Sequence, residues 1–458
     1  MNRTVLFKRL FSTKLTNVRD VKPLLKSQLD TDIHSNIADR AFIKKWVETI
    51  TNNNRSLPPP VLTQQCCDFY KRLDQSGRLV FLKTLANEFG VNRKDVTQKA
   101  YDYIQSDHSE RLEKELREEL EPKYNRFFDR IQQLPNGLKI LTDMRADLLE
   151  MMPYKQDRDV FNMEEDIRLK LKKYLIGFLK FERITWEKSS AELLEKICAY
   201  EAVHAVKDWQ DIKRRLGPDR RVYAFSLKDA PNEPLVFVHV ALVPTMSHSV
   251  QAILDDTKVN SESQFNCATC YSITTQQGLG GINLGNYLIK RVVQDLKVQF
   301  PQLETFCTLS PIPRFKKWLV EHSEDVNIQQ QFRQEVGEDW KMKLNRFNQQ
   351  DQIELKSTLM SLCARYILIE KRNGTSATDP VANFHLRNGA CAHQIHWMAD
   401  TSEKGLKESF GIMINYNYIT ERIELNNQLY LKDGTICVSE PANGWLSNWI
   451  GSDNKRIN

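Results

Sequence analysis

Apolar positions recur with helical spacing in the first part of the chain. From Val61 to about Leu175 they fall three or four residues apart, and Leu112, Leu116 and Leu120 form one such stripe among charged residues. A stripe of this kind packs one face of a helix against a neighbour and leaves the other face in water. This part of the chain therefore predicts a helix-packing module, and it contains no pattern typical of a catalytic site.

After about Tyr174, short β-branched and aromatic runs replace the helical pattern. Because Gly, Pro, Asp or Asn bounds these runs, we expect four strands. They are Val222–Ser226, Leu235–Val243, Cys270–Thr275 and Thr305–Leu309. A helical pattern from about Leu284 to Phe300 lies between the last two, so that strand, glycine-rich loop, helix and strand follow one another in an α/β arrangement.

Two further segments complete the pattern. Helical spacing returns from Glu321 to Glu370, and the segment from His385 to Val438 mixes the two periodicities. Nearer the N-terminus, the proline-rich connector Thr51–Pro60 cannot continue a helix. The patterns predict an α+β protein in which an N-terminal all-α helical bundle, residues 26–175, precedes an α/β domain, residues 176–458.

Composition excludes several other classes of protein. The chain has 458 residues, of which 41% are hydrophobic, and neither Gly nor Pro is enriched, which argues against a fibrous or disordered protein. The most apolar stretch, Leu235–Val243, is about half the length that a transmembrane helix requires, and it contains His239. Nine irregularly spaced cysteines are too sparse for a disulfide scaffold and favour a reducing compartment.

The net charge of +6 is concentrated at the N-terminus. Residues 1–25 contain six basic residues against the single acid Asp20, which accounts for +5 of that charge. The segment also carries Ser, Thr and scattered apolar residues, and Arg9-Leu10-Phe11-Ser12 resembles a matrix-protease cleavage site. These features are typical of a mitochondrial presequence, and a frayed basic tail is the alternative. The nearly neutral remainder argues against a nucleic-acid-binding surface.

A glycine-rich loop connects the third predicted strand to the following helix. It contains Gly278, Gly280 and Gly281 and leads through Ile282 into the helix. Glycines let the backbone turn its amides outward, and the helix N-terminus adds the positive end of a dipole, so the loop can hold a pyrophosphate without a basic side chain. It lacks the features of a Walker or Rossmann loop. The spacing alone leaves anion binding and a structural tight turn both open.

Two more motifs contain candidate catalytic residues. Ser310 lies in Leu309-Ser310-Pro311-Ile312-Pro313, where two prolines restrict the backbone and would hold the hydroxyl in one place. His385 lies in Asn383-Phe384-His385-Leu386. Each motif by itself also fits a structural role, because Ser-Pro often ends a strand and a lone His is usually a hydrogen-bonded structural residue.

Together these motifs resemble those of the malonyl-CoA decarboxylases. The resemblance covers roughly residues 180 to 420 with specific motifs and the helical part more loosely. The motifs are Glu201-Ala202-Val203-His204, Lys213-Arg214-Arg215, Thr274–Gly281, Leu284-Gly285, Leu288–Val293, Leu309–Pro313, Pro380–Leu386, Asn388-Gly389-Ala390 and Trp397-Met398-Ala399-Asp400. The glycine loop by itself resembles the pyrophosphate-binding turn of the GNAT acyltransferase superfamily.

The resemblance implies a helical domain that mediates assembly and a GNAT-like catalytic domain. It implies conversion of malonyl-CoA to acetyl-CoA and CO2, in fatty-acid and malonyl-CoA metabolism, with Ser310 and His385 as the catalytic residues. No metal and no separate cofactor is expected, since coenzyme A is part of the substrate. The implied coenzyme A-binding residues are Gly280, Gly281, Ile282, Asn283, Leu284, Gly285 and Asn286, together with Ser310 and His385.

The chemistry of decarboxylation suits this pair. Loss of CO2 leaves a thioester enolate, which requires hydrogen-bond donors at the carbonyl oxygen and a proton donor for the carbon. The residue types do not decide which residue does which, and the resemblance implies Ser310 as proton acceptor and His385 as donor. Arg314 stands where relatives commonly have Gly, so the adjacent turn or acyl pocket is expected to differ. Supporting positions are predicted at Asn383, Asn388, Tyr416 and Tyr418.

The resemblance also implies an assembly and a location. We expect a homo-oligomer, with a tetramer favoured, and no nucleic-acid partner. We expect the mitochondrial matrix together with a cytosolic pool, and the C-terminal Lys455-Arg456-Ile457-Asn458 is no peroxisomal signal. Two other functions stay open, namely a GNAT acyltransferase, which has no need of the Ser310 and His385 pair, and a non-catalytic acyl-CoA sensor or scaffold.

Three other patterns are not expected to carry chemistry. Cys267-Ala268-Thr269-Cys270 has no second cysteine pair at metal-binding spacing. His393-x-x-His396, considered with Asp400 as a metal site, would place its two histidines on opposite faces of a strand. Cys307 lies within an apolar strand, where we expect a buried and inert thiol.

Overall fold

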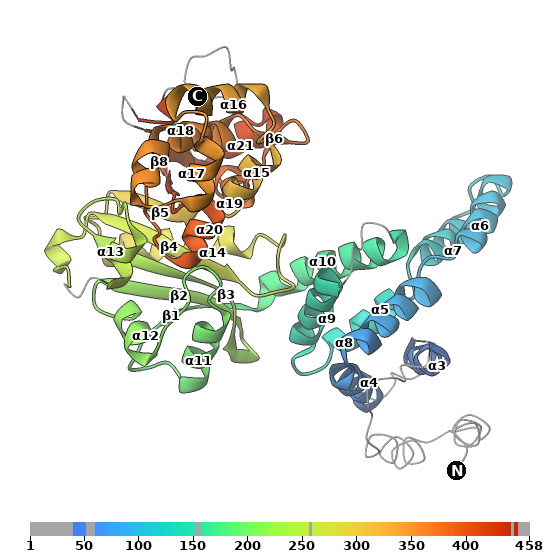
Figure 1. Ribbon diagram of the computed structural model, residues 1–458. Coiled ribbons are helices and arrows are strands. Elements are labelled where there is room, and N and C mark those ends of the chain that lie inside the picture. Colours follow the sequence, from blue (N-terminus) through green and yellow to red (C-terminus); the bar gives the residue numbers. More distant parts are fainter. Residues whose placement is uncertain (1–39, 52–59, 152–156, 256–258, 441–443, 448–458) are drawn as a thin grey trace, which may run out of the picture. The chain divides into compact units, whose positions relative to one another are not determined.

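We describe the protein from a computed structural model, in which residues 40–51, 60–151, 157–255, 259–440 and 444–447 are described. The predicted presequence, most of the Thr51–Pro60 connector and the C-terminal Lys455–Asn458 lie outside these residues. The chain forms two compact units (Figure 1). Unit 1 runs up to Leu179 and also includes residues 227–231 and 276–282, whereas unit 2 contains residues 180–226, 232–275 and those from Asn283 onward.

Unit 1 is built from helices, as the apolar spacing predicts for Val61 to Leu175. Fully buried aromatic side chains such as Phe127 and Phe128 fill its interior. Side-chain caps start several helices, and Asp74 and Asp157 each accept a hydrogen bond from a backbone N–H of the first turn. The helices are α3 (Arg40–Thr51), α4 (Pro60–Arg72), α5 (Gln75–Phe89), α6 (Arg93–Gln105), α7 (Glu110–Leu120), α8 (Tyr124–Gln132), α9 (Gly137–Met151) and α10 (Arg158–Phe178).

The predicted leucine stripe lies on α7. This helix packs against α6, and the two extend together away from the other helices of unit 1 (Figure 1). Neither helix contains a buried residue, and Tyr101, Ile104 and Leu120 are all more than half exposed. The stripe therefore forms a real helix–helix contact, but it leaves apolar side chains uncovered.

Unit 2 contains a seven-stranded mixed sheet with the strand order β1-β2-β3-β4-β5-β9-β8. All four predicted strands are confirmed, while β1, β8 and β9 fall outside the four predicted runs. Strand β4 pairs antiparallel with β3 and parallel with β5, and β9 pairs antiparallel with both β5 and β8. The strands are β1 (Leu179–Ile184), β2 (Arg220–Leu227), β3 (Ala230–Val243), β4 (Cys267–Thr275), β5 (Thr305–Pro311), β8 (Cys391–His396) and β9 (Met413–Asn417).

The predicted helix between β4 and β5 is α14 (Leu284–Gln299). It buries Leu288, Val292 and Leu296, which share one face of the helix, and it packs against β4. Because parallel strands cannot be joined by a tight turn, the chain needs this crossover helix to return to the start of β5. The crossover places the first residues of the two strands side by side, where Cys267 pairs with Thr305 and Cys270 with Thr308.

The remaining helices of unit 2 flank the sheet, and several of them gather near the edge of the sheet that β8 forms. Figure 1 shows α11 and α12 beside β1 and the orange helices α15 to α18 gathered near β8. The small strands β6 (Lys371–Arg372) and β7 (Ser376–Ala377) form a separate hairpin. The helices are α11 (Ala191–Tyr200), α12 (Trp209–Arg215), α13 (Val250–Asp255), α15 (Phe315–Glu321), α16 (Val326–Glu335), α17 (Trp340–Arg346), α18 (Gln349–Leu368), α19 (Pro380–Arg387), α20 (Glu403–Ser409) and α21 (Ile423–Asp433).

The architecture is α+β, with a helical region followed by a mixed sheet flanked by helices, and the predicted fold class is confirmed. Unit 1 is not a continuous N-terminal segment, because the loop at residues 276–282 belongs to it. The boundary between residues 175 and 176 stays a prediction. Within the part of the chain that the structure describes, no helix is both long and apolar enough to span a membrane.

Candidate active site

Ser310 and His385 lie in contact although 75 residues separate them in the chain. Ser310 is on β5, at the strand end marked by the Ser-Pro sequence, and His385 is on α19. The Ser310 Oγ is 3.1 Å from the His385 Nε2, and both side chains are buried in unit 2. The structure therefore brings together the two residues that the sequence singles out.

A chain of hydrogen bonds runs through this pair and fixes the imidazole tautomer. The Ser310 hydroxyl donates to Thr308 Oγ1 at 2.8 Å, so its oxygen is left as an acceptor for His385 Nε2–H. With the proton on Nε2, Nδ1 is the acceptor for the Tyr418 hydroxyl, 2.8 Å away. The arrangement presents a neutral imidazole whose N–H points at Ser310.

Burial decides the charge of this histidine. Its surroundings lower the pKa of His385 to about 3, because the imidazolium would lose its hydration without gaining a charged partner. Burial likewise raises the pKa of Tyr418 well above its usual value. Both groups are therefore neutral at physiological pH, and the imidazole acts as a hydrogen-bond donor through Nε2.

The local structure explains why these side chains meet. Strand β9 pairs with β5 so that Ser310 stands opposite Ile414, and the chain just beyond β9 carries Tyr418. On β9 itself, Tyr416 stacks on the His385 ring with centroids 4.7 Å apart. Asp379 caps α19 by accepting hydrogen bonds from two backbone N–H groups of its first turn, which fixes where the helix begins.

A cavity of about 220 Å³ opens beside the pair. Among its lining residues, none carries a Lys, Arg, Asp or Glu side chain in the described part of the chain. The wall is mostly apolar, with Ser310, His385 and a few hydroxyl groups as its polar positions. The lining residues are Val203, Cys270, Tyr271, Ser272, Ile273, Thr275, Leu309, Ser310, Pro311, Pro380, Val381, Phe384 and His385.

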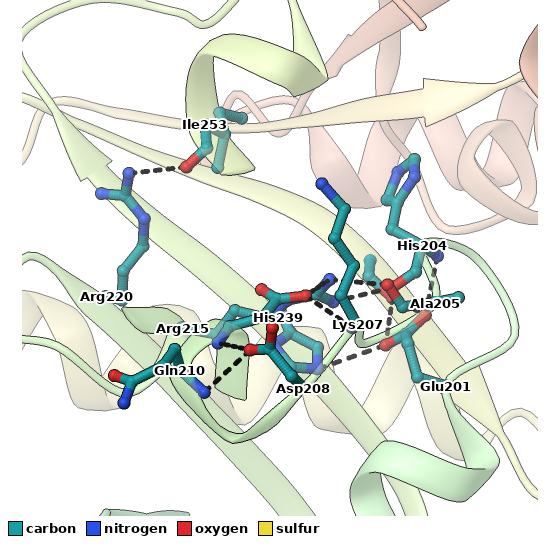
Figure 2. Close-up of polar contacts among 12 residues, drawn as sticks. Glu201, His204, Ala205, Lys207, Asp208, Gln210, Arg215, Arg220, His239 and Ile253 are labelled. Atoms are coloured by element: carbon teal, nitrogen blue, oxygen red, sulfur yellow. Dashed lines mark hydrogen bonds and ion pairs between the residues drawn. The ribbon is translucent and has the colours of Figure 1, made fainter. Parts of the chain in front are cut away.

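A buried carboxylate, Glu201, is hydrogen-bonded to two of the residues that line this cavity, Val203 and Ser272. It accepts hydrogen bonds from the Ser272 hydroxyl at 2.8 Å and 2.9 Å and from the backbone N–H groups of Val203 and His204. Figure 2 shows the Glu201 carboxylate facing His239, whose Nε2 is 3.2 Å away. Burial by itself would raise the pKa of Glu201, but His239, Ser272 and the backbone donors lower it to about 2.

Sequence reasoning did not assign a role to Glu201. The available indication was His239, a polar residue inside the otherwise apolar run Leu235–Val243, since a buried polar group requires a partner. The structure places the Glu201 carboxylate 3.2 Å from His239 Nε2. The carboxylate connects the segment after α11 to strands β3 and β4, and it places Val203 and Ser272 on the cavity wall.

The glycine loop has the geometry of a tight turn. Gly278 and Gly281 have φ values of +85° and +79°, which residues other than glycine rarely adopt. A Cβ on Gly278 would lie 2.1 Å from the backbone oxygen of Thr142 on α9, so the loop packs directly on a helix of unit 1. The N–H groups of Gly280 and Gly281 have no hydrogen-bond partner among the described residues.

The rest of the predicted coenzyme A segment forms the start of α14. Gly280, Gly281 and Ile282 belong to unit 1, and Asn283 to Asn286 belong to unit 2. Asn283 is the N-cap of α14 in a left-handed conformation with φ +65°, and no side chain caps the helix. A Cβ on Gly285 would lie 3.0 Å from the Phe384 ring, so this glycine permits the close approach of α14 to the helix that carries His385.

Two of the four predicted supporting residues contact His385 through their side chains, namely Tyr416 and Tyr418. Asn383 instead accepts a hydrogen bond from Tyr430, and Asn388 ends α19 with its backbone N–H donating to the His385 oxygen. Arg314 begins α15, is exposed, and does not line the cavity.

The cysteine and histidine patterns do not belong to a larger cluster of such side chains among the described residues. Among the described residues there is no group of three or more His, Cys, Asp or Glu that could hold a metal ion. Cys267 and Cys307 are buried, with sulfur atoms 3.6 Å apart. Cys307 is buried, as predicted, and the hydrogen bond with Cys267, together with burial, raises the pKa of this thiol well above its usual value.

Two family models match the chain. The malonyl-CoA decarboxylase N-terminal domain matches residues 89–174, and the malonyl-CoA decarboxylase C-terminal domain matches residues 177–455. Together they account for most of the chain. The protein belongs to the malonyl-CoA decarboxylase family. The family that the sequence motifs resemble is thus confirmed.

Curated relatives and solved structures agree with this assignment. The chain is 39% identical over 429 residues to mitochondrial malonyl-CoA decarboxylase of Mus musculus, covering 84% of this chain and 86% of that protein. It is 37% identical over 429 residues to the mitochondrial enzyme of Anser anser anser, with coverage of 86% and 85%. The crystal structure of malonyl-CoA decarboxylase from Rhodopseudomonas palustris superimposes with a TM-score of 0.78 and 30% identity, covering 87% of this chain and 98% of that one.

Proposed function

We propose that the protein is a malonyl-CoA decarboxylase, a carboxy-lyase that releases CO2 from malonyl-CoA and leaves acetyl-CoA. Membership of the family supports the activity. The observation that carries the mechanism is the uncharged cavity beside Ser310 and His385, whose hydrogen-bonded pair is neutral.

An uncharged cavity favours this reaction for an electrostatic reason. The malonyl carboxylate carries a localised charge, which is poorly stabilised where no Lys or Arg faces it. As CO2 departs, that charge spreads over the thioester enolate, which suffers less from the loss of water. An apolar wall with few hydrogen-bond donors therefore destabilises the ground state more than the transition state.

His385 and Ser310 would stabilise and protonate the enolate. The Nε2–H of His385 donates to the negative charge that develops on the thioester, in the way an oxyanion-hole donor does. His385 is the proton donor of the pair and Ser310 the acceptor, the roles that the family resemblance implies. His385 gives a proton to C2 of the enolate, and solvent returns a proton to His385. One proton is therefore consumed for each CO2 released.

The nucleotide part of coenzyme A would bind to backbone amides. Among the described residues, the N–H groups of Gly280 and Gly281 have no partner, and the start of α14, which no side chain caps, adds the N–H groups of its first turn. This supports a pyrophosphate site at Gly280 to Asn286. No metal or separate cofactor enters the proposed reaction.

Assembly and location follow from the family and from unit 1. We propose a homo-oligomer, with a tetramer favoured, in which the exposed apolar residues Tyr101, Ile104 and Leu120 of α6 and α7 face another copy. The relatives from Mus musculus and Anser anser anser are named as mitochondrial enzymes. We propose the mitochondrial matrix for this chain, with a cytosolic pool in addition.

One assay tests the activity. Purified protein is incubated with malonyl-CoA alone, and CO2 and acetyl-CoA are measured. Stoichiometric formation of both is expected. An acyltransferase would require an acceptor, and a sensor would bind malonyl-CoA without turnover, so either result would overturn the proposal.

Two variants test the site. S310A and H385N should each lower kcat on the order of a hundredfold. The matched controls are S226A, which removes a buried hydroxyl bonded to Glu182 on another part of the sheet, and H322N at the C-cap of α15. Unchanged kcat in S310A and H385N, or an equal loss in the controls, would show that the pair has no special role.

A further inference from the structure

A buried ion pair in unit 1 holds the glycine loop. Arg145 on α9 and Glu164 on α10 have side chains that are each only 4% exposed, and Nε of Arg145 is 2.8 Å from Glu164 Oε1. The same guanidinium donates through Nη1 to two loop carbonyls, those of Gly278 at 2.5 Å and Gly280 at 2.8 Å. No other described side chain donates a hydrogen bond to the loop backbone at residues 278–282.

These contacts set the direction of the loop amides. A trans peptide points its C=O and the following N–H in opposite directions. With the Gly280 oxygen held by Arg145, the N–H of Gly281 must point away from α9 and α10. The positive φ of Gly278 and its packing against the Thr142 backbone restrain the other end of the turn.

The ion pair is difficult to explain as a stabilising contact alone. A buried salt bridge contributes little net stability compared with an apolar pair of the same size, because both charges lose their hydration. A planar guanidinium that binds one carboxylate and two backbone carbonyls, as that of Arg145 does, is well suited to holding a backbone segment in one conformation. A loop that is already ordered binds its ligand without the entropic cost of ordering.

We propose that Arg145, oriented by Glu164, is a positioning residue of coenzyme A binding, which holds the glycine loop with its amides directed at the pyrophosphate. The inference rests on the proposed function for the identity of the ligand. It also assigns the helical unit a part in substrate binding in addition to assembly.

The test uses the full-length chain and two ligands that differ in the nucleotide. R145M should weaken binding of coenzyme A, measured by calorimetry, about tenfold or more, which corresponds to about 1.4 kcal/mol. The KM for malonyl-CoA should rise similarly, whereas kcat should stay within about twofold. With malonyl-pantetheine, which keeps the thioester and lacks the pyrophosphate, the variant and the parent should have the same kcat/KM.

The chain offers a matched control. Arg78 pairs with Asp147, also on α9, and donates to the carbonyls of Leu73 and Lys71, so it has the same kind of contacts without touching the loop. R78M should leave the affinity for coenzyme A unchanged, whatever its effect on the melting temperature. Equal losses in R145M and R78M, or equal losses with malonyl-CoA and malonyl-pantetheine, would overturn the proposal.

Milder variants keep the test decisive if R145M does not fold. R145K retains the charge but replaces the fork with one ammonium, and E164Q retains a hydrogen-bond acceptor for Arg145; each should weaken coenzyme A binding less than R145M. Unchanged affinity in both would also overturn the proposal. Because coenzyme A binding is measured without turnover, a protein that binds it through Arg145 but releases no CO2 would refute only the proposed function.

Discussion

The hydrogen bond from Tyr418 to His385 allows a test, through a single oxygen atom, of the hydrogen-bond chain that sets the imidazole tautomer. Replacing Tyr418 with Phe removes the hydroxyl that lies 2.8 Å from Nδ1 and leaves the ring in place. Without that donor, Nδ1 becomes a buried acceptor with no partner, and the proton is free to move there from Nε2. The tautomer that presents an N–H to Ser310 and the cavity is then no longer favoured.

The size of the effect follows from the cost of an unpaired buried group. Leaving such an acceptor unsatisfied costs about 1–3 kcal/mol. This penalty falls on the tautomer with its proton on Nε2, which is the catalytically competent one. At about 1.4 kcal/mol for each factor of ten, kcat should therefore fall roughly fivefold to 150-fold. The KM should change little, because Tyr418 is not among the residues that line the cavity.

A neighbouring tyrosine supplies the control. Tyr416 stacks on the same imidazole, but its buried hydroxyl has no hydrogen-bond partner among the described residues. Y416F removes an equivalent oxygen but leaves the hydrogen bonds of His385 to Tyr418 and Ser310 intact, so its kcat should stay within about twofold of the parent. Steady-state kinetics with malonyl-CoA measure both. A Y418F enzyme as active as Y416F would refute the reasoning that Tyr418 selects the tautomer.

Three further predictions follow from the cited geometry. Because the pKa of His385 falls from an ordinary value near 6.5 to about 3, the unfolded chain takes up a proton that the folded chain does not as the pH drops through this window. The contribution of the neutral His385 to the free energy of unfolding is fully present above pH 6.5 and falls as the pH drops below it. Urea unfolding should therefore show a free energy of unfolding ~2 kcal/mol lower at pH 5 than at pH 7.5, and this decrease should be missing in H385N. G278A should raise the KM for malonyl-CoA or lower the melting temperature, since its Cβ meets the Thr142 oxygen, whereas G177A on α10, where a Cβ has open space outside the loop, should do neither; similar behaviour of the two would contradict the loop geometry. E201Q should lower the free energy of unfolding by about 1–3 kcal/mol because the carboxylate accepts several buried hydrogen bonds, and the exposed E192Q should change it by less than about 0.5 kcal/mol; a smaller effect in E201Q than in E192Q would exclude that role.

The sequence predicted the elements of this fold well because their periodicity is local. The spacing of apolar residues from Val61 to Leu175 corresponds to helices α4 to α10, and the runs around Val222, Leu235, Cys270 and Thr305 correspond to strands. Strands β1, β8 and β9 were not predicted individually. Their sequences are short or mixed in polarity, and their pairing with distant strands stabilises them.

Part of the site was also visible in the sequence. Ser310 and His385 occur in motifs specific enough to indicate a family, and that family is now confirmed by the matches over residues 89–455. The glycine loop was recognisable because only glycine readily adopts its positive φ values. The roles of these residues in catalysis and in coenzyme A binding stay predictions.

By itself, the sequence determined the helical and mixed parts of the chain, the family and the pair Ser310 and His385. Only the tertiary structure decided their surroundings. Tyr418 is hydrogen-bonded to His385, Ser272 donates to Glu201, and Arg145 donates to the carbonyls of the glycine loop. These contacts join residues tens to more than a hundred positions apart. A periodic pattern reports only which face of an element is buried, whereas the partner of a buried polar group depends on which elements the folded chain brings together.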